Sequence, residues 1–74
     1  MDDTIEKNII YGADVVDEAR LWEAIEEAQL KEFVLSLGEG IKTTVGEQGI
    51  RLSGGQRQRI GIARALYNNP EVLV

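Results

Sequence analysis

The sequence predicts a mainly α-helical domain of three to four helices that ends in the first residues of a β-strand. Apolar residues recur at helical spacing in several segments, and residues typical of helix starts and ends lie between them. Only residues 41–52 form a long stretch without a helical period. The 74 residues are 43% hydrophobic, which is enough for one small core. We therefore expect residues 1–74 to form a single domain.

The first helix is expected over residues 4–10. Asp3 is followed three residues later by Glu6, a spacing typical of a capped helix start. Gly12 lies where a helix of this length would end, because glycine readily adopts the left-handed conformation found after helices.

Two further helices are expected between Asp14 and residue 40. The longer one begins at Asp14 or Asp17, and Trp22 packs in or beside its apolar face. That apolar face consists of Leu21, Ile25 and Ala28. The shorter helix carries a second apolar stripe, formed by Leu30, Phe33, Val34 and Leu37. Residues 38–40 end it, and residues 41–52 are expected to form a loop or a short extended segment.

The last helix is expected from Ser53 to Asn68 or Asn69. Pro70 stops it, because the residue before a proline disfavours the helical conformation. Its predicted core face consists of Ile60, Ala63 and Tyr67. The apolar residues 72–74 are typical of the opening of a buried parallel strand.

The start of this last helix is suited to binding an anion. Ser53 can cap the helix, and Gln56 can reach back to complete a capping box. Gly54 and Gly55 together disfavour a helix by on the order of 2 kcal/mol relative to alanine, but they allow close approach of another molecule to the backbone. The first-turn N–H groups would then face anionic oxygens. The alternative is that Ser53 and Gln56 only cap the helix.

Charge is divided unequally along the chain, whose net charge is −5. Residues 1–49 carry 12 acidic and 4 basic residues, a balance of −8, which disfavours nucleic acid as a partner. Residues 50–74 carry four arginines and one glutamate, a balance of +3. We expect Arg59 and Arg64 to be helix-surface cations, whereas Arg57 could reach a nucleotide. The sequence has no cysteine, which fits a cytosolic compartment.

Three segments resemble ATP-binding-cassette (ABC) ATPases of the exporter type. Residues 52–66, with Leu52-Ser53-Gly54-Gly55-Gln56 at their start, resemble the ABC signature region. Residues 44–49 resemble the exporter segment "TxVGExG", and residues 4–12 resemble "TIxxNIxYG". The chain departs from the pattern at Lys7, where glutamate is common, and at Gly38, where proline is common.

The resemblance implies a helical subdomain of an α/β P-loop ATPase that hydrolyses ATP to drive transport. It implies that Ser53, Gly54, Gly55 and Gln56 face the γ-phosphate of ATP held by a second ABC ATPase domain. It also implies that Glu47 lies near the coupling helices of a transmembrane domain, at the cytoplasmic face of a membrane. The alternative is that Glu47 is only a solvent-exposed carboxylate of a loop. No nucleic-acid partner is implied.

The catalytic motifs of such ATPases are missing from these 74 residues. No G-x-x-x-x-G-K-[ST] motif is present, and the residues that would follow Val74 in the family include the Walker B aspartate and the catalytic glutamate. We therefore expect this chain to be a piece of an ATPase that cannot hydrolyse ATP alone, with Mg²⁺ held by parts outside it. We identify no catalytic residue and no metal ligand.

Three alternatives remain open at this stage. A non-transport ABC ATPase, such as a DNA-repair type, would share the signature region but not the exporter-like residues 4–12 and 44–49. A helix-turn-helix DNA-binding protein would use residues 53–69 for recognition, but the net charge and the two glycines disfavour it. A helical interaction module without a nucleotide role is the third.

Overall fold

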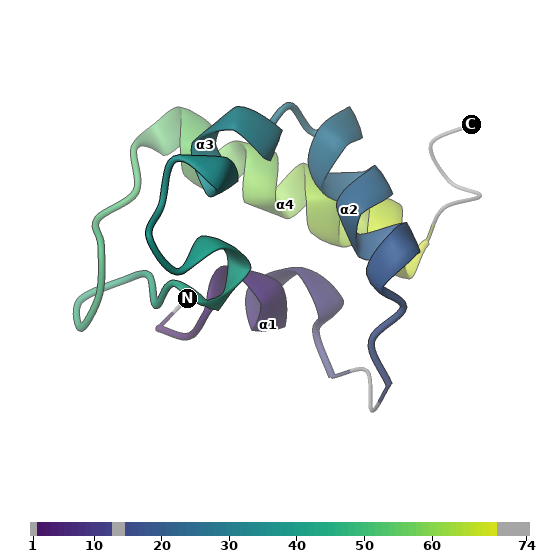
Figure 1. The fold of residues 1–74 in the computed structure, drawn as a ribbon, viewed down its shortest axis with the longest axis horizontal. Helices are drawn as coiled ribbons and strands as arrows, with labels where there is room; N and C mark the ends of the chain where they lie inside the picture. The colour runs from purple at the N-terminus through teal and green to yellow at the C-terminus, as the bar shows by residue number, and fades with distance from the viewer. Residues whose placement is uncertain (1, 13–14, 70–74) are drawn as a thin grey trace.

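The computed structural model describes residues 2–12 and 15–69, and these are mainly helical (Figure 1). In chain order the elements are α1 (Ile5–Ile10), α2 (Glu18–Glu27), α3 (Lys31–Leu35), the 3-10 helix η1 (Gly40–Lys42) and α4 (Gly54–Asn68). The predicted fold class is confirmed for this part of the chain. The predicted strand at residues 72–74 lies outside the described residues. No helix within the described residues is both long and apolar enough to cross a membrane.

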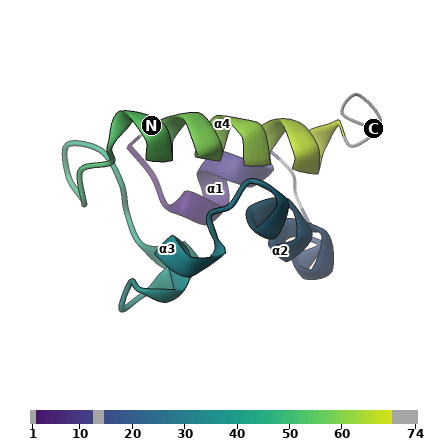
Figure 2. The ribbon, with the colours of Figure 1, turned by 90° about the horizontal axis from the view of Figure 1, so that it is seen from above.

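The helix α4, with 15 residues, lies along one side of the molecule, and the other helices pack on the same side of it (Figure 2). Its apolar face meets α1 and α2, which explains why α4 buries the three residues predicted from its periodicity: Ile60, Ala63 and Tyr67. Other fully buried side chains come from α1, α2 and α3, from the N-cap of α3 and from the loop before α4: Ile5, Ile9, Leu21, Ile25, Leu30, Val34 and Val45. Trp22 is half-buried beside this core, as expected.

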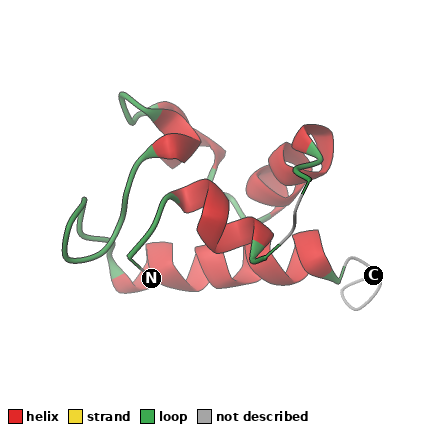
Figure 3. Cartoon of the chain, turned by 90° about the horizontal axis from the view of Figure 1, so that it is seen from below, coloured by secondary structure: helices red, strands yellow, loops and turns green. Residues whose placement is uncertain are grey.

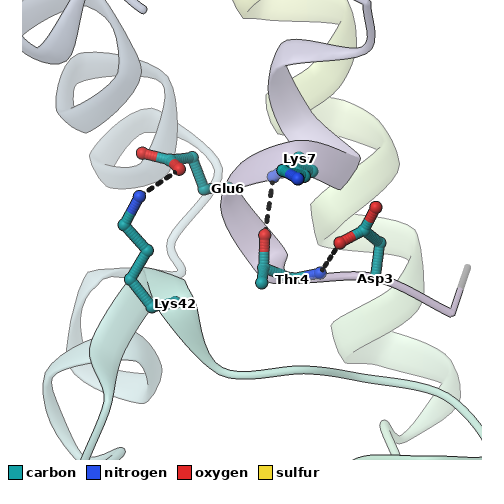
Figure 4. Close-up of polar contacts among 5 residues, drawn as sticks. All are labelled: Asp3, Thr4, Glu6, Lys7 and Lys42. Atoms are coloured by element: carbon teal, nitrogen blue, oxygen red, sulfur yellow. Dashed lines mark hydrogen bonds and ion pairs between the residues drawn. The ribbon is translucent and has the colours of Figure 1, made fainter.

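The start of α1 differs from the prediction. Thr4, and not Asp3, caps the helix: the Lys7 N–H donates to the Thr4 hydroxyl oxygen at 3.1 Å (Figure 4). The Asp3 carboxylate instead accepts from the N–H of Thr4 at 2.7 Å. At the other end Tyr11, with φ of 36°, takes the left-handed position ahead of Gly12.

A partly buried ion pair connects α1 to η1. The Glu6 side chain is almost fully buried, and its carboxylate lies 2.6 Å from the Lys42 ammonium, whose side chain remains largely exposed (Figure 4). The pairing compensates for the loss of hydration at Glu6, since a buried carboxylate without a partner is costly. This contact fixes the position at which the loop leading to α4 begins.

Two contacts hold α2 against the end of α4. Asp17 is the N-cap of α2, so Asp17 is the correct one of the two predicted helix starts. The Asp17 backbone N–H also donates to the Tyr67 hydroxyl at 3.1 Å. The Arg20 guanidinium donates to the Tyr67 carbonyl oxygen and lies 4.8 Å from the centre of the Tyr67 ring. An arginine in this place satisfies a carbonyl at a helix C-terminus, where intrahelical donors are missing.

The connection from η1 to α4 projects at one end of the molecule (Figure 3). It was expected to be a loop or a short extended segment, and it contains isolated β-bridges between Thr4 and Thr44 and between Val45 and Ile50. Val45 is fully buried and anchors this loop in the core. The loop therefore has a defined conformation despite its lack of a helical period.

Candidate functional site: the start of α4 and the loop before it

The start of α4 carries the capping box that the sequence predicts. The Ser53 hydroxyl oxygen accepts from the Gln56 N–H at 3.0 Å, and the Gln56 side-chain oxygen accepts from the Ser53 N–H at 2.9 Å. Ser53 is exposed and Gln56 is half-buried. Because the Ser53 oxygen serves as the acceptor in this bond, its hydroxyl hydrogen remains free to be donated outward.

Among the described residues, the capping box leaves two backbone donors of the first turn without a partner. A helix start has four N–H groups that lack an intrahelical acceptor, and the first N–H bonded in this helix is that of Arg57, to the Ser53 carbonyl. Of the four, the box satisfies Ser53 and Gln56. The N–H groups of Gly54 and Gly55 have no acceptor among residues 2–12 and 15–69.

No described residue packs closely against these two glycines. A Cβ atom at Gly54 would meet nothing within 4 Å, and one at Gly55 would meet only the Ser53 hydroxyl oxygen, at 3.9 Å. Both residues are exposed and neither has a positive φ, so neither packing nor backbone conformation requires glycine there. The helix therefore carries two residues of poor helix propensity where free donors face open space.

Packing does require glycine in the loop before α4. A Cβ at Gly49 would lie 2.0 Å from the Thr44 carbonyl oxygen. A Cβ at Gly46, whose φ is +103°, would lie 1.9 Å from a carboxylate oxygen of Asp2. These two glycines are explained by the fold, in contrast to Gly54 and Gly55.

A surface hollow of about 300 Å³ lies between this loop and the start of α4. Its lining carries two carboxylates and two guanidinium groups, with no ion pair between them among the described residues. The lining residues are Asp2, Gly46, Glu47, Arg51, Leu52 and Arg57. Arg57, singled out as a cation near the predicted site, is thus exposed beside the first turn of α4. Glu47 is exposed as well.

Of the two arginines predicted to be surface cations, Arg59 is exposed but Arg64 has a structural role. The Arg64 side-chain Nε donates to the Asn8 carbonyl oxygen at 2.8 Å, and its guanidinium lies 5.4 Å from the centre of the Tyr11 ring. The prediction for Arg64 was wrong because its acceptor lies 56 positions away in the sequence. No local signal identifies such a partner.

The described residues contain no group of three or more His, Cys, Asp or Glu side chains that could hold a metal ion. The groups available at the start of α4 are hydrogen-bond donors: two backbone N–H groups, one hydroxyl and a nearby guanidinium. These groups suit a phosphate or another anion, since the helix N-terminus also carries a partial positive charge.

Comparison with known proteins identifies the family of this chain. The sequence profile of the family described as "ABC transporter" matches residues 2–74. The chain is 53% identical to an ATP-dependent lipid A-core flippase of Saccharophagus degradans, over 97% of this chain and 12% of the flippase. It is 52% identical to ABC transporter B family member 15 of Arabidopsis thaliana and 50% identical to ABC transporter BEA3 of Gibberella fujikuroi, over 96% of this chain and 6% of each relative. The chain thus spans about an eighth or less of the length of these relatives.

Proposed function

The chain belongs to the ABC transporter family, and we propose on that basis that it is part of the ATP-hydrolysing domain of an exporter. In this proposal residues 1–74 are one partial domain, the helical subdomain of a larger α/β P-loop ATPase. The exporter assignment is supported by relatives named as flippases and as transporters of the B family. The same names disfavour the alternative of a DNA-repair ATPase.

The proposed role of residues 53–56 is to bind the γ-phosphate of ATP that a second ABC ATPase domain holds. Ser53 would donate its hydroxyl and Gly55 its backbone N–H, while Gln56 braces the loop through the capping box. Gly54 would allow close approach of the phosphate. The observation that carries this proposal is that, among the described residues, the N–H groups of Gly54 and Gly55 have no acceptor and face open space.

The residues present fit the terminal phosphate of ATP but not the metal ion that accompanies it. Neutral N–H and O–H donors at a helix N-terminus suit phosphate oxygens, whereas residues 53–56 include no carboxylate to balance the charge of a metal ion. Mg²⁺, which neutralises charge on the β- and γ-phosphates, would be held by parts of the parent protein outside this chain. The contribution of residues 53–56 would be to stabilise charge on the transferred phosphoryl group.

The proposed role of the loop around Glu47 is to contact a transmembrane domain. Glu47 is exposed at the tip of a loop that Val45 anchors in the core, so a force applied at the tip would be transmitted to the start of α4. The partner would be the coupling helices of the parent transporter, at the cytoplasmic face of a membrane. This is also the place where the hollow with mixed charges lies.

The experiment that tests the phosphate-binding role replaces Ser53 by arginine in the full-length parent protein. We expect ATP hydrolysis to be lost, because the bulky cation replaces the donor and blocks the approach to the two glycine N–H groups. The matched control is Ser36→Arg, since Ser36 is an exposed serine at the end of α3, remote in sequence from the site. Equal ATPase rates in both variants would contradict the proposal.

A further inference from the structure

The side chain of Asp2 lies directly against the loop around Glu47. One carboxylate oxygen of Asp2 accepts from the Glu47 N–H at 3.0 Å. The same oxygen occupies the space that a Cβ atom at Gly46 would fill, because it lies 1.9 Å from that position. The φ of +103° favours glycine at position 46, and the Asp2 carboxylate lies where a side chain at that position would begin.

Backbone contacts place this side chain at the end of a short antiparallel pairing. The Ile5 N–H donates to the Thr43 carbonyl at 3.0 Å, and the Val45 N–H donates to the Asp3 carbonyl at 2.9 Å. Thr4 and Thr44 face each other between these two bonds. Asp2 adds one more link beyond the last backbone bond, and it is the only hydrogen-bond partner of the Glu47 N–H among the described residues.

The loop that Asp2 contacts is closed on itself and leads directly into α4. The Ile50 N–H donates to the Thr44 carbonyl at 2.9 Å, and the Gly46 N–H donates to the Ile50 carbonyl at 3.0 Å. Only two residues, Arg51 and Leu52, separate Ile50 from the cap at Ser53. Because this connection is so short, a displacement of the loop tip would also move Ser53.

We propose that Asp2 is a positioning residue for hydrolysis: its carboxylate fixes the loop of residues 44–50 against residues 2–5 and thereby sets the position of Ser53. This inference rests on the proposed function, in which Ser53 faces the γ-phosphate. The requirement is for a hydrogen-bond acceptor and not for a charge, since the partner is a backbone N–H. The Asp2→Asn variant should therefore keep the wild-type activity, whereas the Asp2→Ala variant should lose part of it.

The test compares three variants of the full-length parent protein: Asp2→Ala, Asp2→Asn and Asp3→Ala. Asp3 is the matched control, because it is a neighbouring exposed carboxylate whose one hydrogen bond among the described residues is from the adjacent Thr4 N–H. We expect Asp2→Ala to lower kcat for ATP by about fivefold, which is about 1 kcal/mol and the size of one net hydrogen bond. KM for ATP should stay unchanged, because ATP is held by the partner domain. Asp2→Asn and Asp3→Ala should both match the wild type.

Hydrogen exchange of the Glu47 amide reports on the contact itself. Exchange should be faster in Asp2→Ala and unchanged in Asp2→Asn. A wild-type kcat in Asp2→Ala would overturn the inference, as would an equal loss in Asp2→Ala and Asp2→Asn. A kcat that falls only in step with the melting temperature would also overturn it, since Asp2 would then serve stability alone.

Measuring a Ser53→Arg variant in the same assay distinguishes a failure of the positioning role of Asp2 from a failure of the phosphate-binding role of Ser53. If Ser53→Arg is inactive while Asp2→Ala is fully active, the proposed function stands and the role of Asp2 is refuted. If Ser53→Arg retains activity, the phosphate-binding role fails, and the positioning role of Asp2 fails with it.

Discussion

Replacing Gly55 by leucine tests whether the open space at the start of α4 serves a ligand or the fold. A Cβ there meets only the Ser53 hydroxyl oxygen at 3.9 Å, so the new side chain displaces no packed group. Leucine has a better helix propensity than glycine, by up to about 1 kcal/mol. The chain should therefore be as stable as the wild type or slightly more stable, with a melting temperature that rises by no more than roughly 4–8 °C.

Whereas Gly55→Leu should leave stability unchanged or slightly higher, it should greatly lower the rate of ATP hydrolysis. A leucine side chain would cover the free N–H groups and occupy the space of the γ-phosphate. Loss of one well-placed donor to a developing negative charge costs about 100- to 1,000-fold in rate, so we expect the parent ATPase to lose at least about 100-fold. The assay pairs steady-state phosphate release by the parent with circular dichroism melts of residues 1–74.

Gly61 provides the matched control within the same helix. It is exposed, and a Cβ added there would meet nothing within 4 Å. Gly61→Ala should stabilise the chain by about 1 kcal/mol and leave ATP hydrolysis unchanged. The phosphate-facing role of Gly55 is refuted if Gly55→Leu retains activity, or if its activity falls only in proportion to lost stability.

Three further outcomes are expected. Gly49→Ala should destabilise the chain by about 2 kcal/mol or more, because the new methyl group would lie 2.0 Å from the Thr44 carbonyl oxygen. Gly38→Ala should have only a small effect, because no described atom lies within 4 Å of its Cβ position, and urea unfolding of both variants measures the difference. Residues 1–74 alone should release no phosphate from ATP, since the sequence lacks a P-loop motif; turnover that survives repurification would contradict this. In an NMR titration with ATP, shifts should be small and confined to residues 52–57, and micromolar binding centred on residues 15–35 would be incompatible with the proposed site.

Local signals in the sequence predicted much of the fold. The start of α4 was predicted in full because a capping box involves only Ser53 and Gln56, three residues apart. The core face of α4 followed from helical periodicity, and the resemblance to an exporter-type ABC ATPase is confirmed by the family match and by the relatives. At α1 the same reasoning chose the wrong cap, because Asp3 and Thr4 are both good capping residues and only the tertiary position of the chain decides between them.

Contacts between distant segments could not be predicted. The pairing of residues 2–5 with residues 43–47 depends on how η1 and α1 pack. The paired segments are too short for an alternating pattern of apolar residues to predict their register. For the same reason the requirement for glycine at Gly46 and Gly49 became visible only when the atoms that approach them were located. The bond from Arg64 to the Asn8 carbonyl likewise joins two helices that no local rule brings together.

The most direct test of the central claim, that residues 53–56 act on ATP held by another ATPase domain, is the ATPase rate of mixed dimers of the parent. One defect is Gly55→Leu, and the other is loss of the P-loop lysine that the proposed parent ATPase would carry. In this account each ATP site combines the P-loop of one domain with residues 53–56 of the other. When the two defects lie in different domains, one of the two sites keeps an intact P-loop and intact residues 53–56, so we predict measurable hydrolysis. When both defects lie in the same domain, each composite site has one defect, so we predict none. The reverse pattern would show that residues 53–56 serve ATP bound by their own domain and would contradict the account.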